Sequence, residues 1–408
     1  MSPQIWITGQ AQLSALGNTP NEFSVNLTAP RSNAKALVFE IPGLGQKQLP
    51  VYACDFDLAA IQAPSKLPLD RSSALALGVV MQLLESKQLD IEKIEKSRLG
   101  IYWGSGMSGA SSLDAATKSL YAEQRRIRPT SVVTSMPNAP AAEISLLLGA
   151  RGPCLTYATA CASSAVAIGE AMIALASGRI DVAIVGGSES MLSPGVLASW
   201  DALRVLAQIE KSPQEACRPF DQSRCGFALG EGAAALILET PQHARKLGRS
   251  AIASLSGYAT NCDGHHMTNP SSQGQMVAMS EALKTANLKP QDIGYINAHG
   301  TATAAGDLAE AQSITAVFGA QRVPVSSTKS LHGHLLGGGG AVELMAALHV
   351  LNSGIAPHTA NLIHPDQRFE LDLIQCEPRH IPQLRHVMSN SFAFGGANAV
   401  LIASKCTD

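Results

Sequence analysis

The chain has 408 residues, a length that favours two domains or one body built from two fused halves. Hydrophobic residues make up 46% and charged residues only 15%, so we expect a large core or a large buried subunit contact, and therefore an oligomer. The 30 basic and 32 acidic residues give a net charge of −2, which provides no field for a polyanion and argues against nucleic-acid binding.

The N-terminal residues contain no basic segment followed by a long apolar run, so they predict no signal peptide. No stretch of the chain approaches the roughly 20 apolar residues that span a bilayer. We therefore expect a soluble cytoplasmic protein without a membrane partner.

Short β-rich runs alternate with alanine-rich stretches along the chain, which predicts an α/β protein with a mainly parallel sheet. We expect strands over residues 4–9, 99–104, 154–159, 181–186, 232–239, 251–258, 295–298, 323–326 and 399–404. We expect helices over residues 71–86, 140–148, 162–177, 275–286, 307–317 and 341–351.

The two parts of the chain show a weak internal similarity. Each begins on an apolar strand, contains a strand that enters a small-residue loop, and ends on another apolar strand. A break near residues 241–250 would divide the chain into domains 1–245 and 246–408. The alternative is the general likeness of any two βαβ repeats.

The predicted helix 162–177 is apolar on nearly all sides, which is typical of a helix buried at the centre of a protein. Cys161 immediately precedes it. There the helix dipole would stabilise a thiolate, and free backbone N–H groups could bind an oxyanion. The alternative is a cysteine that packs as a small hydrophobe, which is our expectation for the other seven cysteines. None of the eight is spaced as in a zinc site, so we expect no metal.

Two histidines lie in glycine-rich loops after predicted strands, where catalytic side chains are often placed. His299 belongs to Asn297-Ala-His-Gly-Thr-Ala-Thr, and His334 precedes the four glycines at 337–340. Those glycines predict a close backbone approach or a substrate tunnel. A third loop, Asn390-Ser-Phe-Ala-Phe-Gly-Gly-Ala-Asn, could supply backbone N–H groups to an oxyanion site. The alternatives are structural histidines and an ordinary tight turn.

Five segments in this order resemble the β-ketoacyl-acyl-carrier-protein synthases, and the resemblance covers almost the whole chain. The segments are Thr159-Ala-Cys-Ala-Ser-Ser, Arg218-Pro-Phe-Asp with Leu229-Gly-Glu-Gly-Ala, Asn297-Ala-His-Gly-Thr, Ser327-Thr-Lys-Ser with Gly333-His-Leu-Leu-Gly, and Asn390-Ser-Phe-Ala-Phe-Gly-Gly. The resemblance implies a thiolase-like fold, with duplicated βαβ halves in a five-layered α-β-α-β-α arrangement.

The resemblance also implies catalytic roles. Cys161 matches the nucleophile that carries the acyl chain, and His299 and His334 match the pair that acts on the extender unit. Lys329 matches the lysine beside them, and Glu343 matches the acidic residue that supports this lysine. Phe394 matches the gating phenylalanine, whose backbone N–H joins that of Cys161 in the oxyanion hole.

Further residues match positions that bind substrate or carrier protein. Thr301 and Thr303 match hydroxyls that hold the phosphopantetheine arm, and Phe392 is a further expected substrate contact. Met107 matches the position that closes the acyl pocket. Three exposed basic residues match the docking patch for an acidic carrier protein: Arg125, Arg126 and Arg204.

Together these matches imply decarboxylative condensation of a Cys161-bound acyl chain with malonyl-acyl carrier protein, in the elongating class. The alternatives are an initiating synthase or thiolase that uses acyl-CoA, and a non-catalytic partner subunit. No cofactor is expected, because the phosphopantetheine belongs to the acyl carrier protein. The expected assembly is a homodimer or a heterodimer with a chain-length-factor homologue.

This chain departs from the family pattern at three places. It has four glycines at 337–340 where Gly-Ala-Ala-Gly is usual, His332 where threonine is usual, and a less basic segment at Lys66-Leu-Pro-Leu-Asp-Arg. These departures leave open whether the chain serves housekeeping fatty acid synthesis or a specialised polyene or polyketide pathway.

Overall fold

The computed structural model of the chain describes residues 4–30, 32–41, 43, 45–57, 59 and 61–406. The outermost residues of both predicted halves, 1–3 and 407–408, lie outside this part. Among the described residues, most strands join one eleven-stranded sheet. Its order is β13-β11-β10-β15-β16-β9-β1-β8-β6-β4-β5.

The sheet consists of two halves with the same strand order. The N-terminal half contains β1 (Ile5–Leu13), β4 (Leu99–Gly104), β5 (Cys154–Tyr157), β6 (Val182–Glu189) and β8 (Gly232–Glu239). The C-terminal half contains β9 (Ala253–Cys262), β10 (Tyr295–Asn297), β11 (Pro324–Ser326), β15 (His386–Phe392) and β16 (Ala397–Ser404), with β13 (Asp372–Leu373) at its edge. When the strands of each half are numbered in chain order, with β13 left out, both halves have the strand order 3-2-4-5-1 from the outer edge inwards. Strand 1 of each half, β1 or β9, pairs with the other in the antiparallel pair that joins the halves. This shared topology confirms the predicted duplication, whereas the boundary at residue 245 remains a prediction.

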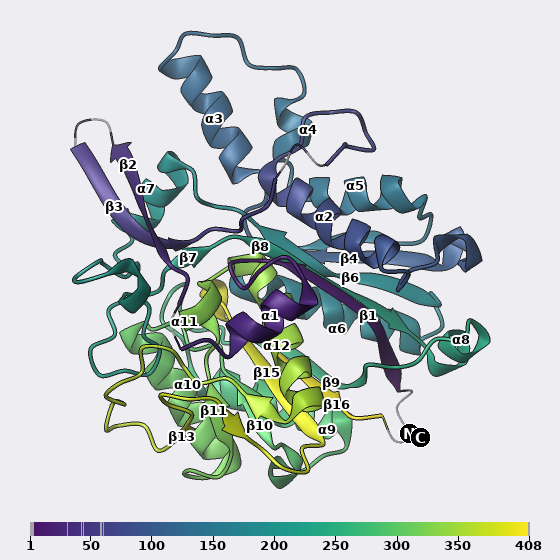
Figure 1. Cartoon of the computed structure of the whole chain (residues 1–408), viewed down its shortest axis with the longest axis vertical. Helices are drawn as coiled ribbons and strands as arrows, with labels where there is room; N and C mark the ends of the chain where they lie inside the picture. Colours follow the sequence, from purple (N-terminus) through teal and green to yellow (C-terminus); the bar gives the residue numbers. More distant parts are fainter. Residues whose placement is uncertain are drawn as a thin grey trace.

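The helices complete five layers (Figure 1). Helices α2 (Arg71–Glu85) and α5 (Ala139–Leu148) cover the outer face of the N-terminal half, and α9 (Ser272–Ala286) and α10 (Ala304–Phe318) cover that of the C-terminal half. Between the halves lie α6 (Ser163–Ala176) and α12 (Gly339–Ser353), which contact each other and strands of both halves. The predicted burial of the helix after Cys161 is confirmed, because most of α6 is inaccessible to solvent.

The expected mainly parallel sheet is wrong, because β8 and β16 run antiparallel to both of their neighbours. Only residues 393–396 connect β15 to β16. A connection of that length allows a hairpin but no crossover, so the pair is antiparallel.

The remaining elements lie mostly at the periphery. Strands β2 (Lys35–Ile41) and β3 (Gly45–Tyr52) form a hairpin that pairs with β7 (Leu229–Gly230), and β12 (Ile355–Ala356) pairs with β14 (Arg379–His380). The other helices are α1 (Pro20–Leu27), α3 (Ala110–Tyr121), α4 (Ser131–Ser135), α7 (Pro194–Ala202), α8 (Pro241–Lys246) and α11 (Lys329–His332). No helix in the described residues has the length and apolarity needed to cross a membrane.

The cysteines are less buried than expected. Cys54 and Cys217 are buried as predicted. The prediction is wrong for Cys154, Cys225, Cys262 and Cys376, which are exposed. Cys154 is exposed because it lies on β5, the edge strand of the sheet.

Candidate active site

Cys161 lies on a tight turn between β5 and α6. Residues Ala160–Ala162 form a 3-10 turn, and Ala160 has the left-handed backbone angle φ = +47°, which non-glycine residues seldom adopt. Ser163 stabilises the turn: its Oγ accepts a 2.9 Å hydrogen bond from the Thr159 N–H and donates a 2.6 Å bond to the Ala160 carbonyl. The turn brings the Cys161 thiol to the inner end of a pocket while leaving the residue only 6% exposed.

The turn requires close backbone packing from Gly104 at the end of β4. A Cβ on Gly104 would lie 2.2 Å from the Ser164 backbone nitrogen. Ser164 belongs to the first turn of α6, whose backbone cannot move away to relieve this clash. We therefore expect Gly104→Ala to destabilise the protein by roughly 1–3 kcal/mol and to lower the thermal midpoint. Gly339→Ala is the matched control, because its Cβ would lie 4.0 Å from the nearest atom, His334 Nδ1. Equal midpoints for the two variants would contradict this packing.

His334 is the imidazole nearest the nucleophile, with its Nε2 atom 3.0 Å from Cys161 Sγ. Two hydrogen bonds fix the backbone of His334 beside β7. The His334 N–H donates to the carbonyl of Ala228, just before β7, at 2.8 Å, and the His334 carbonyl accepts from the Gly230 N–H at 3.0 Å. The edge of the ring packs against Phe227 with a centroid separation of 5.1 Å. His334 Nε2 is therefore placed to accept the proton of the thiol.

His299 faces the same space from the end of β10. Its ring centroid is 5.4 Å from that of His334, at an interplanar angle of 81°. Lys329 Nζ donates to His299 Nδ1 at 3.2 Å, and the same ammonium forms a buried ion pair with Glu343. Because Nδ1 accepts from the lysine, the ring proton resides on Nε2, which becomes a hydrogen-bond donor.

Glu310 on α10 holds the backbone of the His299 loop. Its carboxylate accepts hydrogen bonds from the N–H groups of His299 at 2.8 Å and Gly300 at 2.7 Å. Asn390 Nδ2 donates to the same carboxylate at 3.2 Å. Glu310 was not predicted from the sequence; the available signal was a pair of acidic residues, Asp307 and Glu310, on an alanine-rich helix that follows the His299 loop.

Burial controls the charge of the reactive groups. Desolvation, followed by the positive charge of Lys329, holds the pKa values of His299 and His334 well below the ordinary imidazole value, so both rings are neutral at physiological pH. Desolvation also raises the pKa of the Cys161 thiol to about 12, although Lys329 and the backbone N–H groups of Phe394 and Cys161 oppose it. Burial therefore outweighs the groups that stabilise a thiolate at this helix terminus, and the thiol keeps its proton at rest.

The Phe394 turn closes the site from the opposite side. It comprises Phe394–Gly396, and Gly395 has φ = +82°. The backbone N–H groups of Phe394 and Cys161 both act on the thiol sulfur, so they lie beside the place where the oxyanion of an acyl group attached to this sulfur would form. The Phe394 ring stacks on Trp200 at a centroid distance of 6.3 Å.

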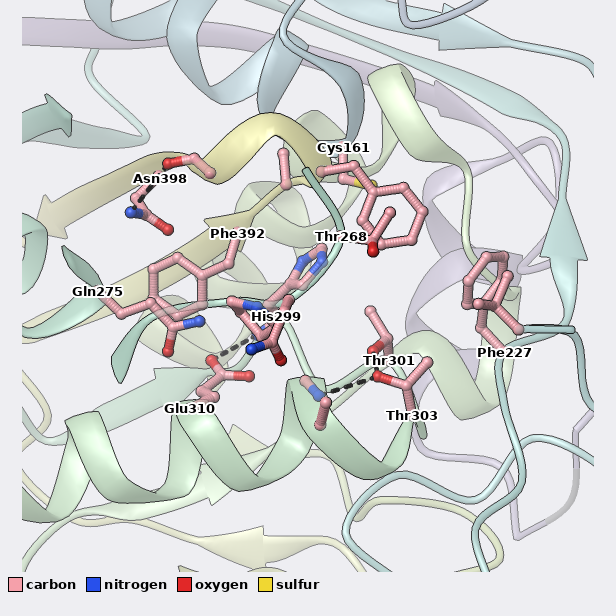
Figure 2. A pocket seen from close by; sticks show the side chains of 18 of the residues that line it. Cys161, Phe227, Thr268, Gln275, His299, Thr301, Thr303, Glu310, Phe392 and Asn398 are labelled. Carbon is pink, nitrogen blue, oxygen red and sulfur yellow. Dashed lines mark hydrogen bonds between the residues drawn. The ribbon is translucent and has the colours of Figure 1, made fainter. Parts of the chain in front are cut away.

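A pocket of about 220 Å³ leads from Cys161 to the surface. Thr301, Thr303 and Phe392 line it, and Figure 2 shows their side chains with that of His299. Their roles in binding substrate remain predictions. The two threonine hydroxyls lie 3.0 Å apart. Met267, which is 71% exposed, marks the outer end.

The other predicted binding residues lie outside this pocket lining. Met107 is 40% exposed, and Arg125 and Arg126 are exposed just after α3. Arg204 is exposed beside Leu203 and Val205, which do line the pocket. The roles assigned to these four residues remain predictions.

The donor atoms of Cys161, His299 and His334 lie within 4.8 Å of one another, which is compatible with a metal ion. The nearby Lys329 ammonium opposes a second cation there. The expectation of a site without metal or cofactor remains a prediction.

Comparison with known proteins agrees with this geometry. Residues 2–244 match the family described as "Beta-ketoacyl synthase, N-terminal domain", and residues 252–363 match "Beta-ketoacyl synthase, C-terminal domain". The 3-oxoacyl-[acyl-carrier-protein] synthase 2 of Staphylococcus aureus (strain COL) is 37% identical over 83% of this chain and 82% of its own length. The synthase of the same name from Vibrio cholerae is 33% identical over 98% of both chains. The structure of the ishigamide ketosynthase/chain length factor superposes with a TM-score of 0.90, at 26% identity, over 100% of both chains.

The thiolase-like fold and the buried cysteine–histidine site define an acyltransferase of the condensing-enzyme class. The chain belongs to the β-ketoacyl synthase family. The resemblance found in its sequence is thereby confirmed.

Proposed function

We propose that the chain condenses a Cys161-bound acyl group with malonyl-acyl carrier protein, giving 3-oxoacyl-acyl carrier protein and CO2. The observation that carries this proposal is the 3.0 Å contact between Cys161 Sγ and His334 Nε2, with His299 facing the same space. In this arrangement the thiol can act as a nucleophile, and the two neutral imidazoles can donate hydrogen bonds to an enolate. We place the reaction in the cytoplasm, in fatty acid synthesis or in a specialised polyene or polyketide pathway.

In the first half-reaction, the acyl group moves from a carrier-protein thioester to Cys161. His334 Nε2 accepts the thiol proton as sulfur attacks the carbonyl carbon. The oxyanion then accepts hydrogen bonds from the backbone N–H groups of Cys161 and Phe394. The carrier thiolate leaves and takes the proton from His334 Nε2. A proton acceptor is needed because the thiol, with a pKa of about 12, is protonated at rest.

In the second half-reaction, malonyl-acyl carrier protein occupies the pocket. The carbon–carbon bond to the carboxylate breaks, CO2 leaves, and the electron pair forms an enolate at the thioester oxygen. His299 donates to this oxygen from Nε2, with the Lys329–Glu343 pair fixing its tautomer. His334 donates alongside it from Nε2, in the tautomer that carries the ring proton there once the acylated sulfur no longer donates to this atom. The enolate carbon then attacks the acyl-Cys161 carbonyl, the carbon–sulfur bond breaks, and the Cys161 sulfur leaves and takes up a proton from solvent.

The pocket suits a carrier-protein arm rather than a resident cofactor. A phosphopantetheine arm is long, thin and largely neutral, and the pocket presents hydroxyls from Thr301 and Thr303 along a mainly apolar wall. Thr303 Oγ1 accepts from the Gly306 N–H at 3.1 Å and lies 3.0 Å from Thr301 Oγ1. One of the two hydroxyl protons joins this pair, so the other can be donated to a ligand. We propose that both hydroxyls hold this arm.

We also propose that the chain works as a dimer, either with itself or with a chain-length-factor homologue. Strand β5 is an edge strand of the main sheet. Exposed apolar side chains gather on β5 and on the neighbouring segment around α4 and α5: Val132, Val133, Met136, Leu146 and Leu155. An open strand edge beside such a surface is the usual signature of a subunit contact.

A reconstituted reaction tests this function. The purified chain is mixed with acyl-acyl carrier protein and malonyl-acyl carrier protein, and the carrier-bound product is identified by mass spectrometry. We expect a 3-oxoacyl product extended by two carbons, together with CO2. Product formed from acyl-CoA with no malonyl carrier protein would instead favour an initiating synthase or thiolase. No product, with either the chain alone or the chain paired with a homologue, would favour a scaffold role.

The docking patch gives a separate prediction. Reversing Arg125 and Arg126 to glutamate should slow association with an acidic carrier protein by roughly tenfold or more at low salt, because steering depends on these charges. Stopped-flow association at two ionic strengths measures the effect, which salt should diminish. The matched control reverses two exposed lysines outside the predicted patch: Lys284 on α9 and Lys289 just after that helix. If both double variants associate at the wild-type rate at low salt, the docking assignment is wrong.

A further inference from the structure

Glu189 is a buried carboxylate with no part in the chemistry above. It is the last residue of β6 and is inaccessible to solvent. Burying a carboxylate is costly unless its oxygens are well supplied with hydrogen bonds. Its contacts therefore indicate what it stabilises.

Glu189 ties together two separate segments of backbone. It accepts hydrogen bonds from the N–H groups of Gly106 at 2.6 Å, Met107 at 3.1 Å and Gly337 at 3.2 Å. The first two donors lie between β4 and α3, and the third begins the glycine run before α12. The carboxylate thus clamps the loop that carries Met107 against the turn that follows His334.

The clamped segments form a wall directly behind the nucleophile. A Cβ on Gly337 would lie 2.1 Å from the Gly106 nitrogen, so the two backbones are in close contact. A Cβ on Gly106 would lie 3.6 Å from the carbonyl oxygen of Ala160, the residue before Cys161. The expected close backbone approach at the glycine run is therefore confirmed.

This wall adjoins an apolar cluster at Cys161, which we take as the side on which an acyl tail would lie. Cys161 belongs to a hydrophobic cluster with Met191, Val196 and Leu336, against which Ala110 packs. Leu336 precedes the clamped Gly337, and Ala110 follows the clamped loop. Gly106, Met107 and Gly337 do not line the pocket at Cys161, so the clamped segments lie outside its lining.

We propose that Glu189 is a positioning and specificity-determining residue, which holds the wall behind Cys161 closed and thereby limits the length of the acyl chain. The proposal rests on the proposed condensing function. Glu189 touches neither substrate nor reacting atoms. A longer chain enters only when the Met107 loop and the Gly337 turn separate.

The protonation state of Glu189 sets how firmly the wall is held. Desolvation raises the pKa of this carboxyl to about 7. The three backbone donors oppose this rise, whereas the nearby Asp70 adds a smaller contribution that also raises the pKa. Above pH 7 the carboxylate accepts all three N–H groups, and below it the protonated acid is a weaker acceptor. Of the other nearby groups, His334 stays neutral from pH 6 to 8 because its pKa lies well below that range, and Arg71 is engaged by Glu231.

Glu189→Gln tests the clamp while preserving side-chain size. Acylation of Cys161 is measured with a series of acyl-carrier proteins of increasing chain length, together with the thermal midpoint. We expect the ratio of long-chain to short-chain acylation rates to rise about tenfold, as loss of one charge-assisted hydrogen bond predicts. Acylation by the shortest primer and malonyl decarboxylation should stay near the wild-type rates.

Glu231→Gln is the matched control, because Glu231 is a buried carboxylate that bonds Arg71 and Ser190 but not the wall. It should leave the chain-length ratio unchanged. A second measurement needs no variant: the wild-type ratio at pH 6 should exceed the ratio at pH 8. This measurement stands even if Glu189→Gln fails to fold.

The possible outcomes distinguish a failure of the Glu189 clamp from a failure of the proposed condensing function. An unchanged ratio in Glu189→Gln and between pH 6 and 8 would overturn the clamp while leaving the condensing function intact. Equal loss at every chain length with a lowered thermal midpoint would make Glu189 merely structural, and would also overturn it. Wild-type protein that accepts no acyl group at any length would overturn the proposed function, and the clamp with it.

Discussion

Replacing Cys161 with alanine is expected to abolish condensation while leaving malonyl decarboxylation measurable. Condensation requires a covalent acyl carrier, and alanine offers no nucleophile, so the loss should be at least about a thousandfold. Decarboxylation requires donors to the enolate oxygen, and these come from His299 and His334, which the substitution leaves in place. Carbon dioxide release and 3-oxoacyl product, measured in the same reaction mixture, report the two activities separately.

Cys217→Ala is the control for this experiment. Cys217 is also buried, and desolvation likewise raises its thiol pKa to about 12, but it does not line the pocket. Both activities should survive that substitution. Condensation by Cys161→Ala within tenfold of wild type would show that another residue carries the acyl chain.

Alanine substitutions at His299 and His334 are expected to distinguish the catalytic roles of the two imidazoles. Each should lower decarboxylation by about a hundredfold to a thousandfold, the usual effect of removing one oxyanion donor. His334→Ala should also slow acylation, because its Nε2 lies 3.0 Å from the Cys161 sulfur. His299→Ala should leave acylation near normal, because its own partner is Lys329. Single-turnover acylation and CO2 release measure the two steps.

His349→Ala provides the comparison, since His349 lies on α12 but outside the Cys161 pocket. It should change neither step by more than a few fold. If His334→Ala decarboxylates malonyl carrier protein at the wild-type rate, the donor role of this histidine is wrong. If it acylates at the wild-type rate, another group accepts the thiol proton.

The sequence alone predicted the elements that carry the chemistry. The turn at Cys161, the buried helix after it and the two histidine loops combine small residues with apolar runs, and such local patterns determine local structure. The structure places Cys161, His299, His334, Lys329 and Glu343 in one buried cluster, although they come from three distant segments. Their convergence was implied only by the family resemblance, because no local pattern encodes it.

Other features could not be predicted because they depend on tertiary contacts. Glu310 and Glu189 look like surface residues in sequence, and only the fold shows that backbone N–H groups from distant segments converge on them. The raised thiol pKa of Cys161 could not be predicted for the same reason: the helix terminus is visible in the sequence, whereas the degree of burial is not. The β2–β3 hairpin was missed because its polar residues obscure the alternation expected of strands.

The most direct test of the central claim is the mass of the peptide that contains Cys161. The protein is incubated with acyl-acyl carrier protein, digested and measured before and after malonyl-acyl carrier protein is added. We predict one acyl adduct on Cys161, which disappears on addition of the malonyl carrier as a 3-oxoacyl product forms. An adduct on a different residue, or a Cys161 adduct that persists while product accumulates, would contradict the account.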